Sequence, residues 1–215
     1  MAFPKEYKIL IGIGIGAILL AWLLFSFGKN DLNQAGPLVD RSDAYVKGSQ
    51  MATVTITEFS DFQCPACQTA QKTVDRIMSE YNGRVKLIFR HFPLDIHPLA
   101  KIAAEASEAA GKQGKFWEMH DLIYQGQAEW GDPAKRLSED QAKEIFKKYA
   151  AELKLDLTLF NQALSDRLYS EVVSKDYNAG LAAGVRATPT FFVNGQAIKS
   201  PSYDAIKQGI EEALK

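Results

Sequence analysis

The feature that most constrains this chain is a pair of cysteines, Cys64 and Cys67, separated by two residues. They are the only cysteines in the protein, and they lie at a predicted strand-to-helix junction. Residues 53–59 alternate and are rich in β-branched side chains, which predicts a strand. After the cysteines, apolar residues recur at helical intervals, which predicts a helix over 68–81.

This placement suits Cys64 to nucleophilic chemistry. Pro65 falls in the first helical turn, where a missing N–H has no cost, so Cys64 is expected at or just before the helix start. Free backbone N–H groups and the positive end of the helix dipole then face its sulfur, which stabilises a thiolate and lowers the thiol pKa. Cys67 lies one turn further, after Pro65 and Ala66, and is close enough to close a small disulfide ring. We interpret the stretch as a redox centre.

Two other uses of the cysteine pair fit less well. A structural zinc site needs four nitrogen or sulfur ligands at characteristic spacings. The chain has no second CxxC, and His91, His97 and His120 show no zinc-ligand spacing. A purely structural disulfide across so short a loop would constrain the unfolded chain little. We therefore expect no metal.

One carboxylate in the predicted strand is unusual. On a period-two strand, Val54, Ile56 and Glu58 share a face, so Glu58 lies on the apolar side of what should be a central strand. It is either a strand-end residue that turns outward to solvent or a buried carboxylate beneath the cysteines. We favour the second interpretation, in which burial raises the pKa of Glu58 and lets it exchange a proton with Cys67.

The N-terminal part of the chain predicts a membrane anchor. Residues 9–27 carry no charge, and a helix of that length spans roughly 28 Å, near the thickness of a bilayer core. Lysines within residues 1–8 predict a cytoplasmic N-terminus. A cleaved signal peptide is the alternative, although no clear A-x-A site follows the apolar run. The polar residues 28–42 are expected to form a linker.

The rest of the chain reads as strands separated by a long helical stretch. A second strand is predicted over 84–92, and residues 97–184 are helical almost throughout. A hairpin follows, with strands at 190–193 and 196–198 around an Asn-Gly turn. A final helix is expected over 202–214. The net charge of −1 gives no reason to expect a nucleic-acid partner.

This order, with a redox CxxC heading the first helix, resembles the thioredoxin fold, and its helical insertion resembles DsbA-like thiol–disulfide oxidoreductases. The resemblance covers roughly residues 43–215 and depends on four ordered motifs, VTITEFSDFQCPAC, FRHFPLDIHPLA, GKFWEMHDLIY and GVRATPTFFVNG. It implies an α/β, thioredoxin-like fold with a helical insertion at about 97–184. One transmembrane helix is expected to precede it.

The resemblance also implies roles for individual residues. A buried glutamate six residues before the first cysteine matches Glu58, and the family's cis-proline matches Pro189, preceded by Thr188. In the family this proline packs against the cysteines, and the residue before it offers backbone hydrogen bonds to an extended substrate. Cys64 is then expected to form a mixed disulfide that Cys67 resolves. No cofactor is expected beyond the redox-active disulfide of these two cysteines.

The direction of exchange depends on further considerations. Strongly oxidising relatives carry a histidine between the cysteines, and Pro65 and Ala66 stand there instead. An anchored domain outside the cytoplasm nevertheless favours disulfide formation. We expect an oxidant of intermediate strength on the extracytoplasmic, periplasmic side of the cell membrane. Its partners would be reduced or misoxidised client proteins and a quinone-linked membrane thiol oxidase that recycles it. A reductase or isomerase of the same fold, a non-catalytic thioredoxin-like module and a copper chaperone are the alternatives.

Overall fold

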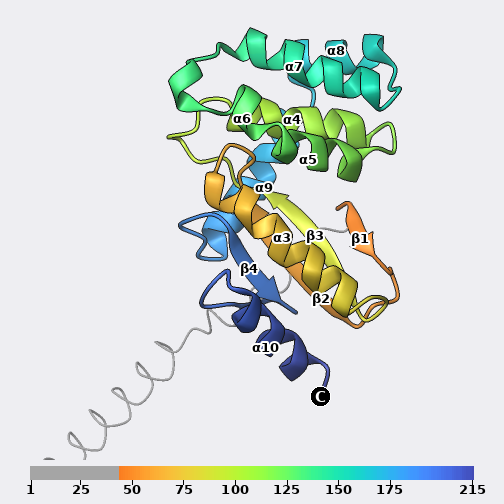
Figure 1. Cartoon of the computed structure of the whole chain (residues 1–215), viewed down its shortest axis with the longest axis vertical. Coiled ribbons are helices and arrows are strands. Elements are labelled where there is room, and N and C mark those ends of the chain that lie inside the picture. Colours follow the sequence, from red (N-terminus) through yellow and green to blue (C-terminus); the bar gives the residue numbers. More distant parts are fainter. Residues whose placement is uncertain (1–43) are drawn as a thin grey trace, which may run out of the picture. The chain divides into compact units, whose positions relative to one another are not determined.

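The centre of the fold is a mixed sheet of five strands, in a computed structural model that describes residues 44–215. The strand order is β1-β3-β2-β4-β5 (Figure 1). The central strand β2 (Val54–Ser60) runs parallel to β3 (Val85–His91) and antiparallel to β4 (Thr190–Val193). The predicted second strand is confirmed as β3, and the predicted hairpin is confirmed as β4 with β5 (Gln196–Ala197). The edge strand β1 (Val46–Gly48), antiparallel to β3, is not predicted by the sequence.

The helices divide into three that pack on the sheet and a group that forms a separate layer. Figure 1 shows α4 to α8 stacked beyond one end of the sheet. The bounds are α3 (Pro65–Glu80), α4 (Ala100–Gly111), α5 (Phe116–Gln125), α6 (Gln127–Trp130), a 3-10 turn η1 (Pro133–Lys135), α7 (Glu139–Glu152), α8 (Leu157–Ser165), α9 (Ser170–Ala182) and α10 (Tyr203–Ala213).

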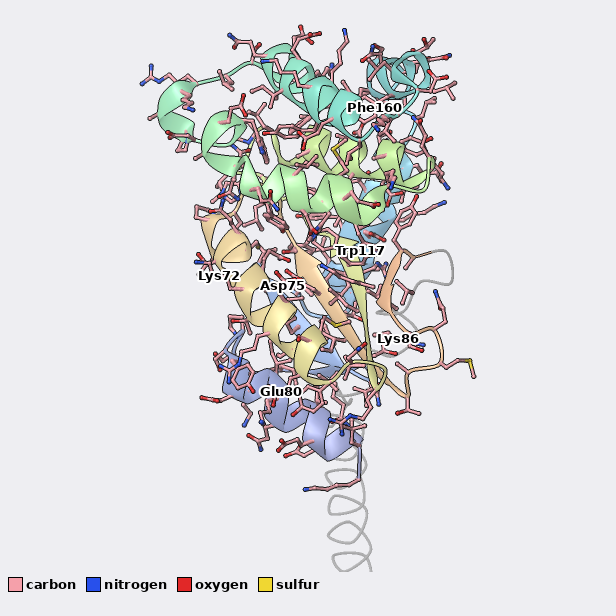
Figure 2. The ribbon with its side chains drawn as sticks, turned by 45° about the vertical axis from the view of Figure 1, so that its right-hand side comes forward. Lys72, Asp75, Glu80, Lys86, Trp117 and Phe160 are labelled. Atoms are coloured by element: carbon pink, nitrogen blue, oxygen red, sulfur yellow. The ribbon has the colours of Figure 1, made fainter. Side chains whose placement is uncertain are left out.

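The helix that begins at the cysteines is amphipathic. Ala70, Val74 and Ile77 of α3 are buried against the sheet. Lys72 and Asp75 are exposed on its outer side (Figure 2). The same apolar cluster includes side chains of β2, β3, β4 and α10, so α3 and α10 cover one face of the sheet. Burial of this apolar stripe is what holds the cysteine-bearing end of α3 in place.

The opposite face of the sheet packs against α9. Phe59 of β2 points to this face and meets the ring of Phe92 edge-on, with ring centroids 6.3 Å apart. Gly180 of α9 lies so close that an added Cβ would be 2.6 Å from the Phe92 ring. Arg90 Nε and Asp176 Oδ1 form an almost fully buried ion pair at 2.8 Å. Close packing and buried charge together fix α9 to the sheet.

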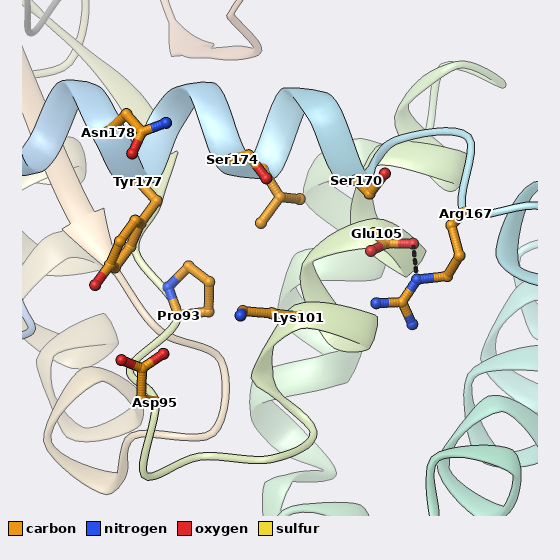
Figure 3. Close-up of a pocket in the computed structure, with 10 residues that line it drawn as sticks. Pro93, Asp95, Lys101, Glu105, Arg167, Ser170, Ser174, Tyr177 and Asn178 are labelled. Carbon is orange, nitrogen blue, oxygen red and sulfur yellow. Dashed lines mark ion pairs between the residues drawn. The ribbon is translucent and has the colours of Figure 1, made fainter.

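A pocket opens between α4 and α9 (Figure 3). The Oε2 atom of Glu105 lies 3.2 Å from Arg167 Nε, and Arg167 Nη1 lies 2.8 Å from Glu139 Oε1. The buried carboxylate of this pocket therefore already has an ionic partner. Arg167 adopts a left-handed φ of 54° and ends the preceding helical stretch. The next helix, α9, therefore begins only at Ser170.

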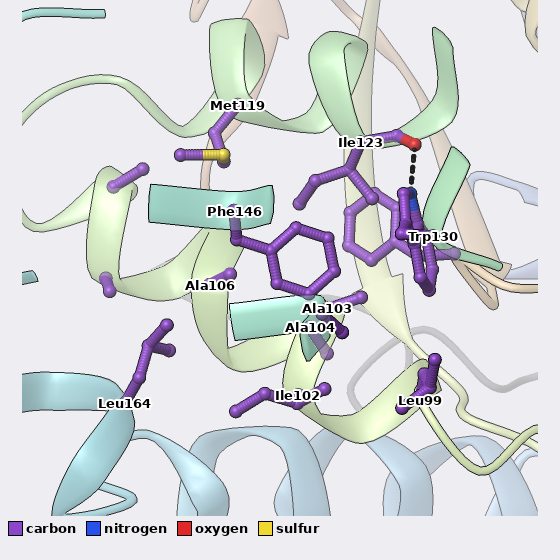
Figure 4. Packing of buried hydrophobic residues seen from close by; sticks show 14 of the residues in the cluster. Leu99, Ile102, Ala103, Ala104, Ala106, Met119, Ile123, Trp130, Phe146 and Leu164 are labelled. Atoms are coloured by element: carbon purple, nitrogen blue, oxygen red, sulfur yellow. Dashed lines mark hydrogen bonds between the residues drawn. The ribbon is translucent and has the colours of Figure 1, made fainter. Parts of the chain in front are cut away.

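The helical layer has an apolar core of its own (Figure 4). The ring of Phe146 from α7 packs there against alanines of α4 such as Ala103 and Ala106, whose small side chains allow close helix approach. Trp130 of α6 is fully buried and donates its Nε1–H to the carbonyl oxygen of Ile123 at 2.8 Å. This core fixes the short helix α6, which reaches back to the cysteine loop.

The predicted α/β fold of the thioredoxin type, with helices between β3 and β4, is confirmed. The expected transmembrane segment 9–27 lies outside the described residues, as do the segments 1–8 and 28–42 on either side of it. Within residues 44–215, no helix combines the length and apolarity needed to cross a membrane.

Candidate active site

Cys64 occupies the N-cap of α3, where the sequence predicts it. Its backbone is extended, with φ −76° and ψ 121°, and its N–H donates to the Asp61 carbonyl at 3.1 Å. Pro65 and Ala66 begin the helix and are exposed. Both cysteines are free thiols, but Cys64 is 7% exposed whereas Cys67 is 0% exposed. Cys64 is therefore the sulfur that an external thiol or disulfide can reach.

The surroundings of Cys64 favour its thiolate. Its pKa is lowered from 9.0 to about 5, and the largest cause is a hydrogen bond from the Cys67 thiol. Backbone N–H groups of Cys67 and Ala66 add to the effect, whereas burial opposes it. The sequence predicts that helix N–H groups lower the pKa of Cys64. In the structure, the Cys67 thiol lowers it more than those N–H groups do. An ionised Cys64 is the reactive form for thiol–disulfide exchange.

Cys67 has the opposite character. Burial raises its pKa, and the neighbouring Cys64 raises it further. Glu58 lies beneath the same turn of α3, because Gln71 Nε2 donates both to Glu58 Oε1 at 3.2 Å and to the Cys67 carbonyl at 3.3 Å. Glu58 is 0% exposed, so the alternative of a solvent-facing glutamate is wrong. Burial raises the pKa of Glu58 to about 7, against the opposing hydrogen bonds from Ser60 and Gln71.

A buried hydroxyl network connects this carboxylate to its surroundings. Ser60 Oγ donates to Glu58 Oε1 at 2.7 Å and lies 2.9 Å from the Tyr124 hydroxyl. The Tyr124 hydroxyl has a second possible acceptor in the Asp61 carbonyl oxygen, 3.5 Å away. The Asp61 N–H donates to Cys67 Sγ at 3.5 Å, and the Ser60 hydroxyl partly opposes the rise in the pKa of Cys67. Burial raises the pKa of Tyr124 well above its ordinary value, so this hydroxyl remains protonated.

The loop before Cys64 is held by the carboxylate of Asp61. Its Oδ1 accepts from the Gln63 backbone N–H at 2.7 Å. Its Oδ2 accepts from the Leu94 N–H at 2.8 Å and lies 2.7 Å from His97 Nδ1. Because Leu94 and His97 belong to the loop after β3, one buried carboxylate ties two loops at the carboxyl ends of neighbouring parallel strands.

The helical layer supports the same loop through two glutamines. Gln127 Nε2 of α6 donates to the carbonyls of Phe62 at 2.7 Å and Cys64 at 3.1 Å. Gln63 Nε2 donates to the Gly131 carbonyl at 3.1 Å. Both amides therefore hydrogen-bond backbone carbonyls across the boundary between the cysteine loop and the helical layer. The helical layer therefore positions the cysteine loop directly.

The segment before β4 completes the site. The Thr188–Pro189 peptide bond is cis, which the sequence alone could not establish. The Cys64 thiol donates to the Thr188 carbonyl oxygen at 3.6 Å. Pro189 is buried. The predicted proximity of this segment to the reactive cysteine is thus observed.

A groove of about 740 Å³ runs beside the cysteines. Pro65 and Gln68 of α3 form one side, and Leu137, after η1, contributes to the other. The loop after β3 adds His97 and Ile96, and the Ile96 side chain is 79% exposed. This groove gives a second polypeptide room to approach Cys64 across both the sheet and helical layers.

The structure brings together the residues that the sequence singled out, namely Glu58, Cys64, Cys67, Thr188 and Pro189. Their catalytic roles remain predictions. Within residues 44–215, no three His, Cys, Asp or Glu side chains are grouped as a metal site requires.

Sequence reasoning missed several residues of the site. They are polar, buried and hydrogen-bonded around the cysteine loop: Ser60, Asp61, Gln63, Tyr124 and Gln127. Ser60 carried a local signal, because it lies two residues after Glu58 and so shares its face of the strand. Tyr124 and Gln127 contact the loop from more than 60 residues away in the sequence, and no local pattern reveals such a contact.

Comparisons with known proteins agree with this geometry. Residues 41–212 match the family described as Thioredoxin. The crystal structure of oxidised BdbD from Bacillus subtilis superimposes with a TM-score of 0.69 at 28% sequence identity. That match covers 80% of this chain and 92% of that chain.

Two kinds of protein are similar to this chain in sequence. A probable disulfide bond formation protein D of Bacillus cereus is 33% identical over 220 residues, covering 100% of this chain and 97% of the relative. The Na(+)/H(+) antiporter NhaA 3 of Salinispora tropica is 37% identical over 217 residues, covering 93% of this chain and 31% of the antiporter. The chain therefore spans about a third of the length of the antiporter relatives that it matches.

Proposed function

Because the chain belongs to the DsbA-like family of thiol–disulfide oxidoreductases, we propose that it oxidises thiol pairs of other proteins to disulfides by exchange at Cys64-Pro65-Ala66-Cys67. The observation that carries the proposal is the unequal environment of the two sulfurs. Cys64 caps a helix, is the more accessible sulfur and has a pKa of about 5, whereas Cys67 is buried and its pKa is raised.

The exchange proceeds in two balanced steps. A client thiolate attacks Cys64 in the Cys64–Cys67 disulfide, forming a mixed disulfide and releasing Cys67 as a thiolate that takes up a proton. The second client thiolate then attacks the client sulfur of the mixed disulfide. Cys64 leaves as a thiolate, which its low pKa favours. Two electrons pass from the client dithiol to the enzyme disulfide, and one of the two client protons is released.

The other site residues assist this chemistry. Thr188 precedes a cis-proline, and its carbonyl faces Cys64, so its backbone is placed to bind an extended client segment beside the reactive sulfur. Glu58, with its pKa raised to about 7, is suited to exchange the proton that Cys67 gains and loses. The exposed Ile96 and the groove beside Cys64 give the client an apolar surface.

The low pKa of Cys64 favours an oxidant over a reductant. A stabilised thiolate makes the dithiol form more stable and therefore raises the reduction potential. The absence of a histidine between the cysteines limits this effect, so we expect intermediate strength. Equilibration with glutathione buffers measures the potential. It should lie between about −120 mV, typical of a strong oxidant, and about −270 mV, typical of thioredoxin. A value at or below the thioredoxin potential would assign a reductase.

The cellular setting is part of the proposal. Residues 9–27 would anchor the chain, with residues 1–8 in the cytoplasm, 28–42 as a linker and the catalytic domain on the periplasmic side. The uncharged run and the lysines before it support this arrangement. Alkaline washing of membranes from cells that express the full chain should leave the protein in the pellet. Its release would exclude the anchor.

A membrane thiol oxidase linked to quinone would return the enzyme to its disulfide form. Membrane vesicles that contain such an oxidase should re-oxidise the reduced protein only when quinone is present. Re-oxidation at the same rate in quinone-depleted vesicles would exclude that partner.

Two variants test the enzymatic proposal directly. Cys64→Ala should abolish oxidation of a reduced client protein, because no accessible sulfur remains. Cys67→Ala should accumulate mixed disulfides on Cys64, visible as thiol-sensitive adducts by mass spectrometry. Oxidation by the Cys64→Ala variant at the wild-type rate would show that the cysteine pair is not the active centre.

A further inference from the structure

We propose that the Ser60 hydroxyl, held in place by Tyr124, relays a proton between Glu58 and Cys67 during exchange. This inference rests on the proposed function, because it concerns the proton that Cys67 gains when the disulfide opens. It assigns a proton-relay role to Ser60 and a positioning role to Tyr124.

The contacts place Ser60 at the branching point of the buried network. Ser60 ends β2, two residues after Glu58, so both side chains point toward α3. Ser60 Oγ lies 2.7 Å from Glu58 Oε1 and 2.9 Å from the Tyr124 hydroxyl. The N–H of the next residue, Asp61, donates to Cys67 Sγ at 3.5 Å, so the buried sulfur lies against the Ser60–Asp61 peptide. Ser60 is 1% exposed, which leaves bulk water little access to the hydroxyl.

The protons on these groups allow two arrangements that differ in whether Glu58 or Cys67 is ionised. A serine hydroxyl donates one hydrogen bond and accepts up to two. When Glu58 is ionised, Ser60 donates to it and accepts from Tyr124, while Cys67 keeps its proton. When Glu58 is protonated, it donates to Ser60, Ser60 donates to the Cys67 thiolate, and Tyr124 donates to the Asp61 carbonyl 3.5 Å away. The first arrangement uses the contacts seen in the structure, and the second requires the Ser60 hydroxyl proton to turn from Glu58 toward the sulfur that lies against the next peptide.

These two arrangements are the beginning and end of one proton transfer. Attack of a client thiolate on Cys64 breaks the Cys64–Cys67 bond and leaves the electron pair on Cys67. Ser60 gives its proton to the Cys67 thiolate and receives the proton of Glu58. Glu58 ends as a carboxylate, which solvent reprotonates before the next turnover. The reverse sequence removes the Cys67 proton when the disulfide re-forms.

Charged and titratable groups from three elements act on this network. Lys47 of β1 favours the ionised form of Glu58, and Asp75 of α3 opposes it. From α5, Tyr124 remains protonated, so it can hold Ser60 in position without competing for the transferred proton. Burial dominates these effects and leaves the pKa of Glu58 at about 7. Glu58 can therefore lose and regain a proton near neutral pH.

Rapid-quench reaction of the oxidised full-length protein with reduced glutathione tests the relay, because acid quenching, alkylation and mass spectrometry measure the Cys64–glutathione mixed disulfide that forms as Cys67 is released. In the wild type, the rate per glutathione thiolate should fall as the pH rises through about 7, where Glu58 loses its proton. Ser60→Ala should lower the rate below that pH by on the order of 10²-fold and remove the pH dependence. Ser60→Thr, which keeps the hydroxyl, should restore both.

Matched variants separate the relay from a structural effect. Ser107→Ala removes another fully buried serine hydroxyl, bonded only to the Ala104 carbonyl, and should leave the rate and its pH profile unchanged. Tyr124→Phe should reduce the rate several-fold with the pH dependence retained, and it carries the test if Ser60→Ala does not fold.

The outcomes distinguish the relay from the function on which it rests. A wild type that reacts with glutathione, together with a Ser60→Ala variant of equal rate and equal pH profile, would overturn the relay alone. A wild type that does not react with glutathione would overturn the oxidoreductase assignment and the relay together.

Discussion

Replacing Glu58 by glutamine should make the folded protein more stable at neutral and higher pH. The pKa of this carboxyl is raised by burial from 4.5 to about 7. A carboxyl whose pKa is higher in the folded state favours folding fully below its unfolded pKa, and that contribution is lost as the pH rises through the folded pKa. Since each pKa unit corresponds to about 1.4 kcal/mol, a shift of about 2.5 units corresponds to about 3 kcal/mol.

Urea unfolding of the reduced protein at a series of pH values measures this effect. The difference in unfolding free energy between Glu58→Gln and wild type should be constant below about pH 4, grow in favour of the variant through pH 7, and level off above about pH 8. Only the change in this difference with pH is diagnostic, because the two thiols titrate alike in both proteins.

Glu118→Gln provides the control. Glu118 lies at the surface, and its hydrogen bond with Lys115 lowers its pKa. Neutralising it should produce a small pH dependence of the opposite sign. If the Glu58→Gln difference stays within about 0.5 kcal/mol from pH 4 to pH 9, Glu58 ionises normally and the argument for its proton role fails.

Three further measurements probe the site and its supports. The ultraviolet absorbance of the Cys64 thiolate should titrate near pH 5 in the wild type and at a higher pH in a variant without the Cys67 thiol. A wild-type midpoint of about 8.5, the value of a free cysteine, would show that the helix start and the Cys67 thiol do not stabilise the thiolate. Asp176→Ala should lower the urea-unfolding free energy by about 3–5 kcal/mol, because Arg90 keeps a buried charge without this carboxylate; a loss below about 1 kcal/mol would contradict that account. Gly180→Ala should cost about 1–3 kcal/mol by crowding the Phe92 ring, and an unchanged melting temperature would show that α9 shifts freely.

Much of the sheet and its main helix could be predicted, because their signals are local. The alternation before Cys64 and the helical spacing after it define β2 and α3 within a few residues. Smaller elements carry weaker signals. β1 has three residues and α6 has four, too few for a periodic pattern to be recognised. In the stretch predicted to be helical from residue 97, the first helix begins only at Ala100, and the N–H of Leu99 before it donates to the Gln63 side chain.

The residues of the site also divide into those that a local sequence signal reveals and those that it does not. Cys64, Cys67 and Glu58 lie within one short segment, so spacing and strand alternation were enough to relate them. The contacts of Asp61 with His97 and of Ser60 with Tyr124 join separate elements, at sequence separations of 36 and 64 residues. Such contacts depend on how the helical layer docks on the sheet, which periodicity does not encode.

The energetic cost of Glu58 supports a functional role for the buried network. An apolar side chain or a glutamine in its place would avoid a penalty of about 3 kcal/mol above neutral pH, a large share of the stability of an ordinary domain. The residue also sits in the one region where the two thiol pKa values are driven in opposite directions. Cys64 can therefore attack and leave as an anion. Cys67 must gain and lose its proton where solvent does not reach it. A buried group that titrates near pH 7 meets this second need. In the proposed relay, Ser60, 2.7 Å from that carboxylate, carries the proton to Cys67.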